Sequence, residues 1–137
     1  MNTGDDFVVM FFSMIFAGAL STMNVWVDRP SDIRFSLNDV YMILLMTGWM
    51  FLFTGVFYKK IKTIAIGAAL IASMFLCIRT QFGITGEQYK LGMIPHHSMA
   101  VYNSKRYLAR GERDEPLRIF ARNVIRNQEN EIRFLKR

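Results

Sequence analysis

The chain has 137 residues, a formal net charge of +6 and a hydrophobic content of 52%, which includes 12 Phe and 10 Met. This length allows one or at most two domains. Its one cysteine, Cys77, excludes an intramolecular disulfide. The basic residues form no patch interleaved with aromatic residues, so we expect no nucleic-acid partner.

Three long segments carry no charged residue: 21 positions at residues 7–27, 19 at residues 40–58 and 16 at residues 63–78. The hydrocarbon core of a bilayer is about 30 Å thick and needs about 20 apolar helical residues. Lys62 can snorkel and so extend the third segment. Alternatively these are three buried helices of a soluble core, but so small a protein could not cover helices that are apolar all round. We therefore predict three transmembrane helices.

The first segment differs from a secretory signal. Its leader, MNTGDDF, is acidic and has no Lys or Arg, whereas a signal peptide needs a positive n-region. We predict an uncleaved anchor of an inner or plasma membrane. The lysines within residues 59–62 favour the cytoplasmic side for that loop, which puts the C-terminal part on the periplasmic or outer side. Arg29, Arg34 and Arg79 favour the opposite orientation.

The segment after residue 82 predicts two further helices. Thr85 and Gln88 have capping-box spacing, so a helix is expected from residue 86 to about residue 110. GERDEP forms a turn, and Pro116 falls in the first turn of a last helix that runs from about residue 115 to near the end. The predicted fold is an all-α membrane protein, with a three-helix transmembrane anchor at residues 1–82. An antiparallel helical hairpin that faces water follows at residues 83–137.

Charge also separates the two parts. Residues 86–137 hold 11 Lys or Arg and 6 Asp or Glu, a net charge of +5, whereas the remaining residues hold 6 and 5, a net charge of +1. A basic surface of this kind can meet lipid headgroups or an acidic partner. More often such charges only solvate a helix.

The apolar face of the last helix has a polar interruption. Gln128 and Glu131 lie on this face at helical spacing. If the hairpin folds about residues 112–113, residue 97 lies opposite residue 128. His97 therefore meets the interruption. Buried polar groups need partners, so these side chains either hydrogen-bond one another in the seam or bind a metal ion.

The metal interpretation rests on the types of donor. Imidazole, thioether and carboxylate together can hold copper, and without the thioether they could hold zinc. Met93 precedes His97 by four residues, so both side chains can point at one ion. Neighbouring residues point about 100° apart, so His96 joins His97 only if Pro95 bends the helix. Otherwise it pairs with Met99 on a neighbouring face or subunit. The candidate ligands are Met93, His96, His97, Met99, Gln128 and Glu131.

Two stretches carry a resemblance to a known family. MIPHHSMAV at residues 93–101 and NVIRNQENEI at residues 123–132, with a Pro-containing acidic turn between them, resemble domain-of-unknown-function family 305. The resemblance covers about residues 86–137, and the preceding spans look like the small membrane-anchored branch of that family. It implies a ferritin-like helical bundle, and some members are periplasmic copper-binding proteins. The chain departs from the pattern at Asn103, where a methionine is expected, and at Met99, where small residues are common.

Two functions follow as expectations. The first is a membrane-anchored metal-binding protein, for copper rather than zinc. The second is a non-catalytic accessory or assembly subunit of a larger membrane complex, with the histidine pair structural. The chain has no Glu-x-x-His motif, and Cys77 lies in an apolar segment far in sequence from both histidines, so we expect no enzyme. A hairpin of this size has little core, so the expected partners, besides the bilayer, are a second copy or a larger complex.

Overall fold

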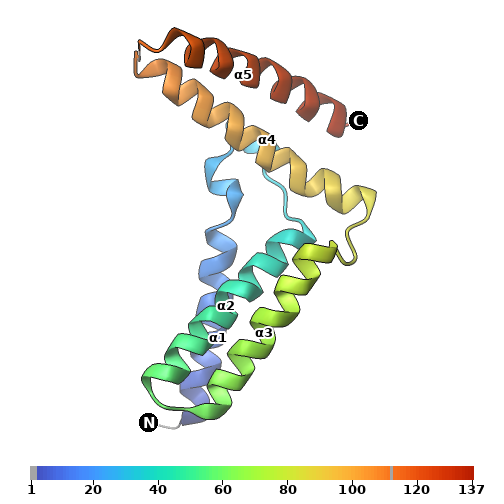
Figure 1. Cartoon of the computed structure of the whole chain (residues 1–137). Helices are drawn as coiled ribbons and strands as arrows, with labels where there is room; N and C mark the ends of the chain where they lie inside the picture. Colours follow the sequence, from blue (N-terminus) through green and yellow to red (C-terminus); the bar gives the residue numbers. More distant parts are fainter. Residues whose placement is uncertain (1–2, 112) are drawn as a thin grey trace. The chain divides into compact units, whose positions relative to one another are not determined.

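A computed structural model describes residues 3–111 and 113–137, and this part of the chain is helical, with no strand (Figure 1). The prediction of an all-α protein is confirmed. Two short 3-10 turns, η1 and η2, lie between the first two helices. The elements are α1 (Thr3–Leu20), η1 (Met23–Trp26), η2 (Pro30–Asp32), α2 (Leu37–Phe57), α3 (Ile61–Thr80), α4 (Gly86–Ala109) and α5 (Glu115–Leu135).

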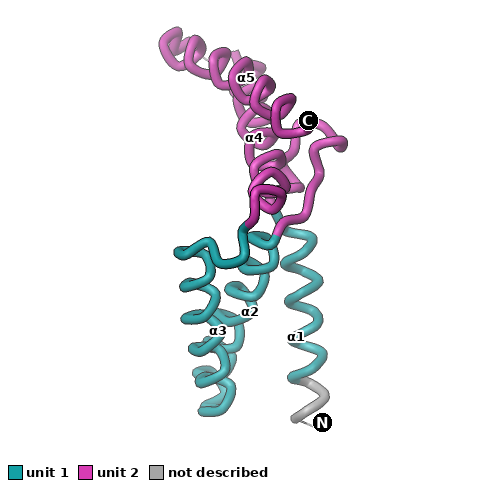
Figure 2. The backbone as a smooth tube through the Cα atoms, turned by 90° about the vertical axis from the view of Figure 1, so that its right-hand side faces the viewer, with its two compact units in different colours: residues 1–22, 37–84 teal, residues 23–36, 85–137 magenta. Residues whose placement is uncertain are grey.

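The chain divides into two compact units, which Figure 2 distinguishes by colour. Unit 1 comprises residues 1–22 and 37–84, and unit 2 comprises residues 23–36 and 85–137. The sequence placed residues 23–36, hereafter the linker, in the anchor at residues 1–82. In the structure the linker belongs instead with the hairpin, because two of its carboxylates are bonded to α4 and α5.

Three segments are long and apolar enough to cross a membrane: Phe7–Trp26, Leu37–Phe57 and Ile61–Thr80. The second and third lie in unit 1, and the first begins there and ends in the linker. Most of their surface is exposed, as expected of helices that contact lipid. The helix α1 ends at Leu20, earlier than the first charge-free segment does, because the chain turns there into the linker. The other two helices begin two or three residues before the predicted segments, since the helical pattern continues through a few polar residues.

The α2 and α3 helices approach closely through glycines. A Cβ atom built on Gly67 would lie 2.5 Å from the Leu52 backbone nitrogen and 2.8 Å from the Gly48 carbonyl oxygen. A Cβ atom on Gly55 would lie 2.7 Å from the Ile64 backbone nitrogen. Small residues at these positions allow the two backbones to pack directly, as is common between helices in a bilayer.

Unit 2 contains the predicted hairpin, and the expected helix ends are confirmed. The Thr85 hydroxyl accepts a hydrogen bond from the Gln88 N–H at 3.3 Å, which caps α4. The Asp114 carboxylate accepts one from the Leu117 N–H at 3.0 Å, and Pro116 occupies the first turn of α5. The small apolar core between the helices is formed by Ile94, Val101 and Ile132, with Ile125 and Leu135 packed against it.

Candidate functional site

The structure brings His97 together with the two polar residues that interrupt the apolar face of α5. His97 is buried in the seam between the two helices, and its side chain is 10% exposed. Its Nδ1 atom lies 2.8 Å from Oε2 of Glu131. The Gln128 side chain lies close enough to the same ring to raise its pKa, against the larger effect of burial. Residues that are some 30 positions apart in sequence thus meet where the helical projection places them.

The His97 ring has an unusual bonding state. Nδ1 lies 2.8 Å from the Glu131 carboxylate, but it makes no hydrogen bond of acceptable geometry with any described residue. Burial lowers the pKa of His97, because desolvation disfavours the charged ring, and this outweighs the opposing effect of the Glu131 charge. The imidazole is therefore neutral at pH 7. A neutral imidazole is the form that binds metal ions.

The second histidine does not join this cluster. Pro95 is buried inside α4, which continues through it, and the His96 side chain is exposed. The two imidazole centroids are 6.0 Å apart, and the rings are inclined at 75°. Met93 and Met99 are each half-buried. Within residues 3–111 and 113–137, no three His, Cys, Asp or Glu side chains lie close enough together to hold a metal ion.

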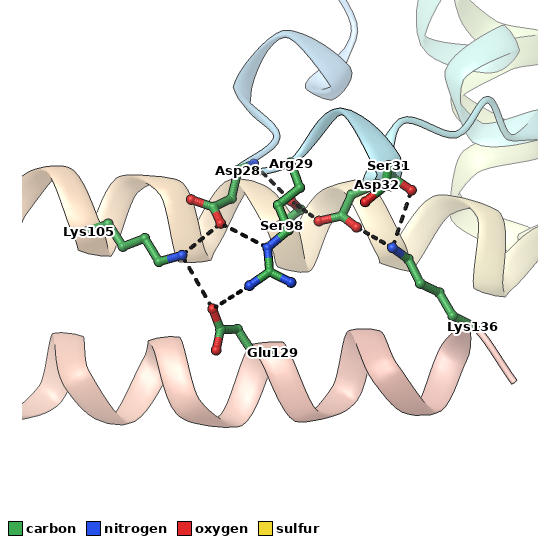
Figure 3. Close-up of polar contacts among 8 residues, drawn as sticks. All are labelled: Asp28, Arg29, Ser31, Asp32, Ser98, Lys105, Glu129 and Lys136. Atoms are coloured by element: carbon green, nitrogen blue, oxygen red, sulfur yellow. Dashed lines mark hydrogen bonds and ion pairs between the residues drawn. The ribbon is translucent and has the colours of Figure 1, made fainter.

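A polar network that the sequence analysis missed joins the linker to the hairpin, and Figure 3 shows it. Asp32 is 2% exposed and accepts a hydrogen bond from the Ser98 hydroxyl at 2.7 Å. It also forms an ion pair with Lys136 at 2.5 Å. Burial raises the pKa of Asp32, but the bonds from Lys136 and Ser98 and the positive charges of Lys136 and Arg29 together lower it below its usual value. Asp32 is therefore ionised at neutral pH.

The second half of the network involves Asp28. Its backbone N–H donates to the Ser98 hydroxyl at 2.8 Å, and its carboxylate pairs with Lys105 at 2.7 Å. Lys105 also lies 3.3 Å from Glu129, which links α4 to α5 (Figure 3). The hydrogen bond that Lys105 donates to Asp28, together with the nearby carboxylates, raises the pKa of Lys105. The network therefore holds the linker against both helices of the hairpin.

A cavity of about 110 Å³ lies within this network, lined by Asp28, Asp32, Ser98 and Lys136, among others. These side chains are bonded to one another, so the cavity belongs to the polar network that holds the linker against the hairpin. The sequence contains one feature that indicates this network. Asp28 and Asp32 lie four residues apart on either side of Pro30, in a loop between two apolar segments. Carboxylates in such a loop are solvated by water unless the protein supplies other partners.

Comparison with known proteins places the chain in a family. An uncharacterized protein of Acanthamoeba polyphaga mimivirus is 41% identical to it over 130 residues, which cover 91% of this chain and 85% of the viral protein. The chain belongs to the family of this viral protein. Because the match covers 91% of the chain, the family includes residues of both units. No family model and no solved structure matches the chain, so the resemblance to family 305 stays a prediction.

Proposed function

We propose that this member of the viral protein's family is a membrane-anchored metal-binding protein without enzymatic activity, and that its ion is copper. In this proposal the three apolar helices anchor the chain in an inner or plasma membrane, and the hairpin lies on the periplasmic or outer side. One observation carries the proposal. The buried, neutral imidazole of His97 has a nitrogen beside a carboxylate and without an aligned hydrogen bond.

The donor set favours copper over zinc. His97 supplies an imidazole nitrogen, Glu131 a carboxylate oxygen and Gln128 an amide oxygen, and Met93 lies one helical turn before His97. Thioether ligands select Cu(I), whereas zinc sites use imidazole, thiolate and carboxylate. A bound copper ion would add a soft positive charge that the Glu131 carboxylate partly neutralises. The protein residues hold the ion and keep the imidazole deprotonated.

The test is a Cu(I) titration of the detergent-purified full chain with a competing chelator, together with elemental analysis. We expect about one copper ion per chain. Replacing His97 with Ala should weaken binding at least tenfold, because the buried nitrogen is the central donor. Replacing Met93 with Leu, which keeps the volume of the side chain, should weaken Cu(I) binding more than Zn(II) binding.

The matched control is His96→Ala, which removes the exposed imidazole from the next position of the same helix. This variant should keep the stoichiometry and the affinity of the wild type within a few fold. Circular dichroism would establish that both variants remain helical. The proposal is wrong if the wild-type protein binds no copper, or if the His97 variant binds it as tightly as the wild type does.

A second candidate function is favoured by a different observation. Large apolar side chains of α5, among them Phe120 and Phe134, are exposed on the hairpin. Such a surface is typical of a protein that docks on a partner, as an accessory or assembly subunit of a membrane complex would. Charge reversal at Arg118, Arg122 or Arg126 that abolishes function, with normal function of the His97→Ala variant, would support this role over metal binding.

A further inference from the structure

One side of the hairpin carries two regular stripes of side chains, hereafter the open face. They recur at alternating spacings of three and four residues, the pattern of a coiled-coil seam. None of the twelve side chains is buried. The members are Tyr89, Met93, His96, Ala100, Asn103 and Tyr107 on α4, and Leu117, Phe120, Val124, Asn127, Glu131 and Phe134 on α5.

The open face lies on the side of the hairpin opposite the linker. At 100° per residue, the α4 stripe is centred about 170° from Ser98, Tyr102 and Lys105, the residues that contact the linker. The α5 stripe is likewise on the far side from Glu129 and Lys136. The linker therefore covers one side of a two-helix layer and leaves the other side to solvent. Phe120 is 62% exposed and Phe134 is 70% exposed on that side.

The charge of the open face is unlike that of the rest of the hairpin. Residues 86–137 contain 11 Lys or Arg, and none of them occupies a position in either stripe. At 100° per residue, Arg118, Arg122 and Arg126 of α5 all lie more than 100° from the centre of its stripe. The open face carries one carboxylate, Glu131, and one imidazole, His96, and its other side chains are apolar or uncharged. Two copies of this basic hairpin could therefore approach through it without bringing their arginines together.

The spacing of the residues in the α5 stripe is the same when it is read from either end of the helix. In an antiparallel pair of α5 helices, Leu117 lies opposite Phe134 of the other copy, and Val124 lies opposite Asn127. The stripe from residue 117 to residue 134 is about 26 Å long, and two helices are about 20 Å wide. The flat projection of this face is therefore roughly 500 Å². Because side chains protrude, its accessible area is larger than the projection and comes close to the area of about 800 Å² that each partner buries in a standard interface.

We propose that the open face is an interface for a second copy of this chain, and that two hairpins pair through it into a four-helix bundle. The pairing covers the exposed phenylalanines of both copies and completes a core that one hairpin is too small to form. The interface does not depend on a bound metal ion. A failure of copper binding would leave this inference standing, and a monomeric protein would leave the metal proposal standing.

The first test measures the mass of the full chain in detergent, with the micelle mass subtracted. We expect a dimer that dissociates at least tenfold more readily in the Phe120→Asp variant, because residue 120 lies opposite Glu131 of the other copy in the antiparallel pair and the substitution brings two carboxylates together in the seam. Ile119→Asp is the matched control. Ile119 is the adjacent residue and is 51% exposed, but it lies on the outer side of α5, so this variant should dimerise as the wild type does.

A second test keeps the seam nearly intact. In a Cys77→Ser background, Asn127→Cys places a thiol near the centre of the α5 stripe, and Arg126→Cys places one on the outer face. Under mild oxidation the Asn127 variant should form a covalent dimer in at least tenfold higher yield than the Arg126 variant. A monomeric wild type at tens of micromolar, equal yields from the two cysteine variants, or unchanged dimerisation of Phe120→Asp would overturn the proposal.

Discussion

Replacing Asp32 with Ala should release the linker from the hairpin. The substitution removes the acceptor of the Ser98 hydroxyl and the counter-ion of Lys136, at 2.7 Å and 2.5 Å respectively. Removing one partner of a fully buried ion pair lowers the stability by about 3–5 kcal/mol. The loss is smaller here, because the Lys136 side chain is 30% exposed and water can solvate it in the variant. A loss of about 2 kcal/mol, the range of a hydrogen bond to a charged group, is the appropriate magnitude.

Amide hydrogen exchange of the full chain measures this effect locally, which avoids assuming two-state unfolding for a protein with two units. The reporter is the Asp28 N–H, which donates to Ser98 in the folded linker. A loss of about 2 kcal/mol corresponds to exchange about 30-fold faster, since about 1.4 kcal/mol is a factor of ten. Ser31→Ala is the control, because Ser31 is adjacent and exposed, and it should change exchange less than threefold. If the Asp28 amide in the Asp32 variant exchanges as slowly as in the wild type, the network does not hold the linker.

Two further predictions concern pH and packing. The pKa of Asp32 is lower in the folded protein than its usual value of 3.8, so its stabilisation is fully present above pH 3.8 and is lost as the pH falls through the lower folded value. The exchange rate of the Asp28 amide, corrected for its intrinsic pH dependence, should therefore rise only in that acidic range. In the Asp32→Asn variant this acid-induced rise should be absent. Gly67→Ala should destabilise the packing of α2 on α3 by about 1–3 kcal/mol, since the added Cβ meets backbone atoms of Leu52 and Gly48. Detergent unfolding followed by circular dichroism measures this loss, and Ala68→Gly at a neighbouring exposed position is the control for a change in helix propensity; equal stability of Gly67→Ala and the wild type would contradict the close approach.

The helices could be predicted because their signals are local. Charge-free segments identified the three long apolar helices, and Thr85 and Pro116 marked the starts of α4 and α5 within a residue. The meeting of His97 with Gln128 and Glu131 could also be predicted, because a short turn fixes the register of an antiparallel hairpin.

The attachment of the linker could not be predicted in the same way. Its contacts with the hairpin join residues 66 or more positions apart, such as Asp32 with Ser98 and with Lys136, and no periodicity or spacing relates them. The direction of His96 was open because Pro95 could have bent the helix. In the structure α4 continues through Pro95, and adjacent side chains keep their divergent directions. Ligand geometry of this kind depends on backbone detail that the sequence does not specify.

The central claim, that His97 binds copper, can be tested most directly by NMR of protein labelled with ¹⁵N in histidine. The chain has two histidines, so the spectrum contains two imidazoles, and His96→Ala assigns them. Stoichiometric Cu(I), which is diamagnetic, should shift the ring nitrogens of His97 and leave those of the exposed His96 nearly unchanged. The account is contradicted if neither imidazole shifts, or if His96 alone responds.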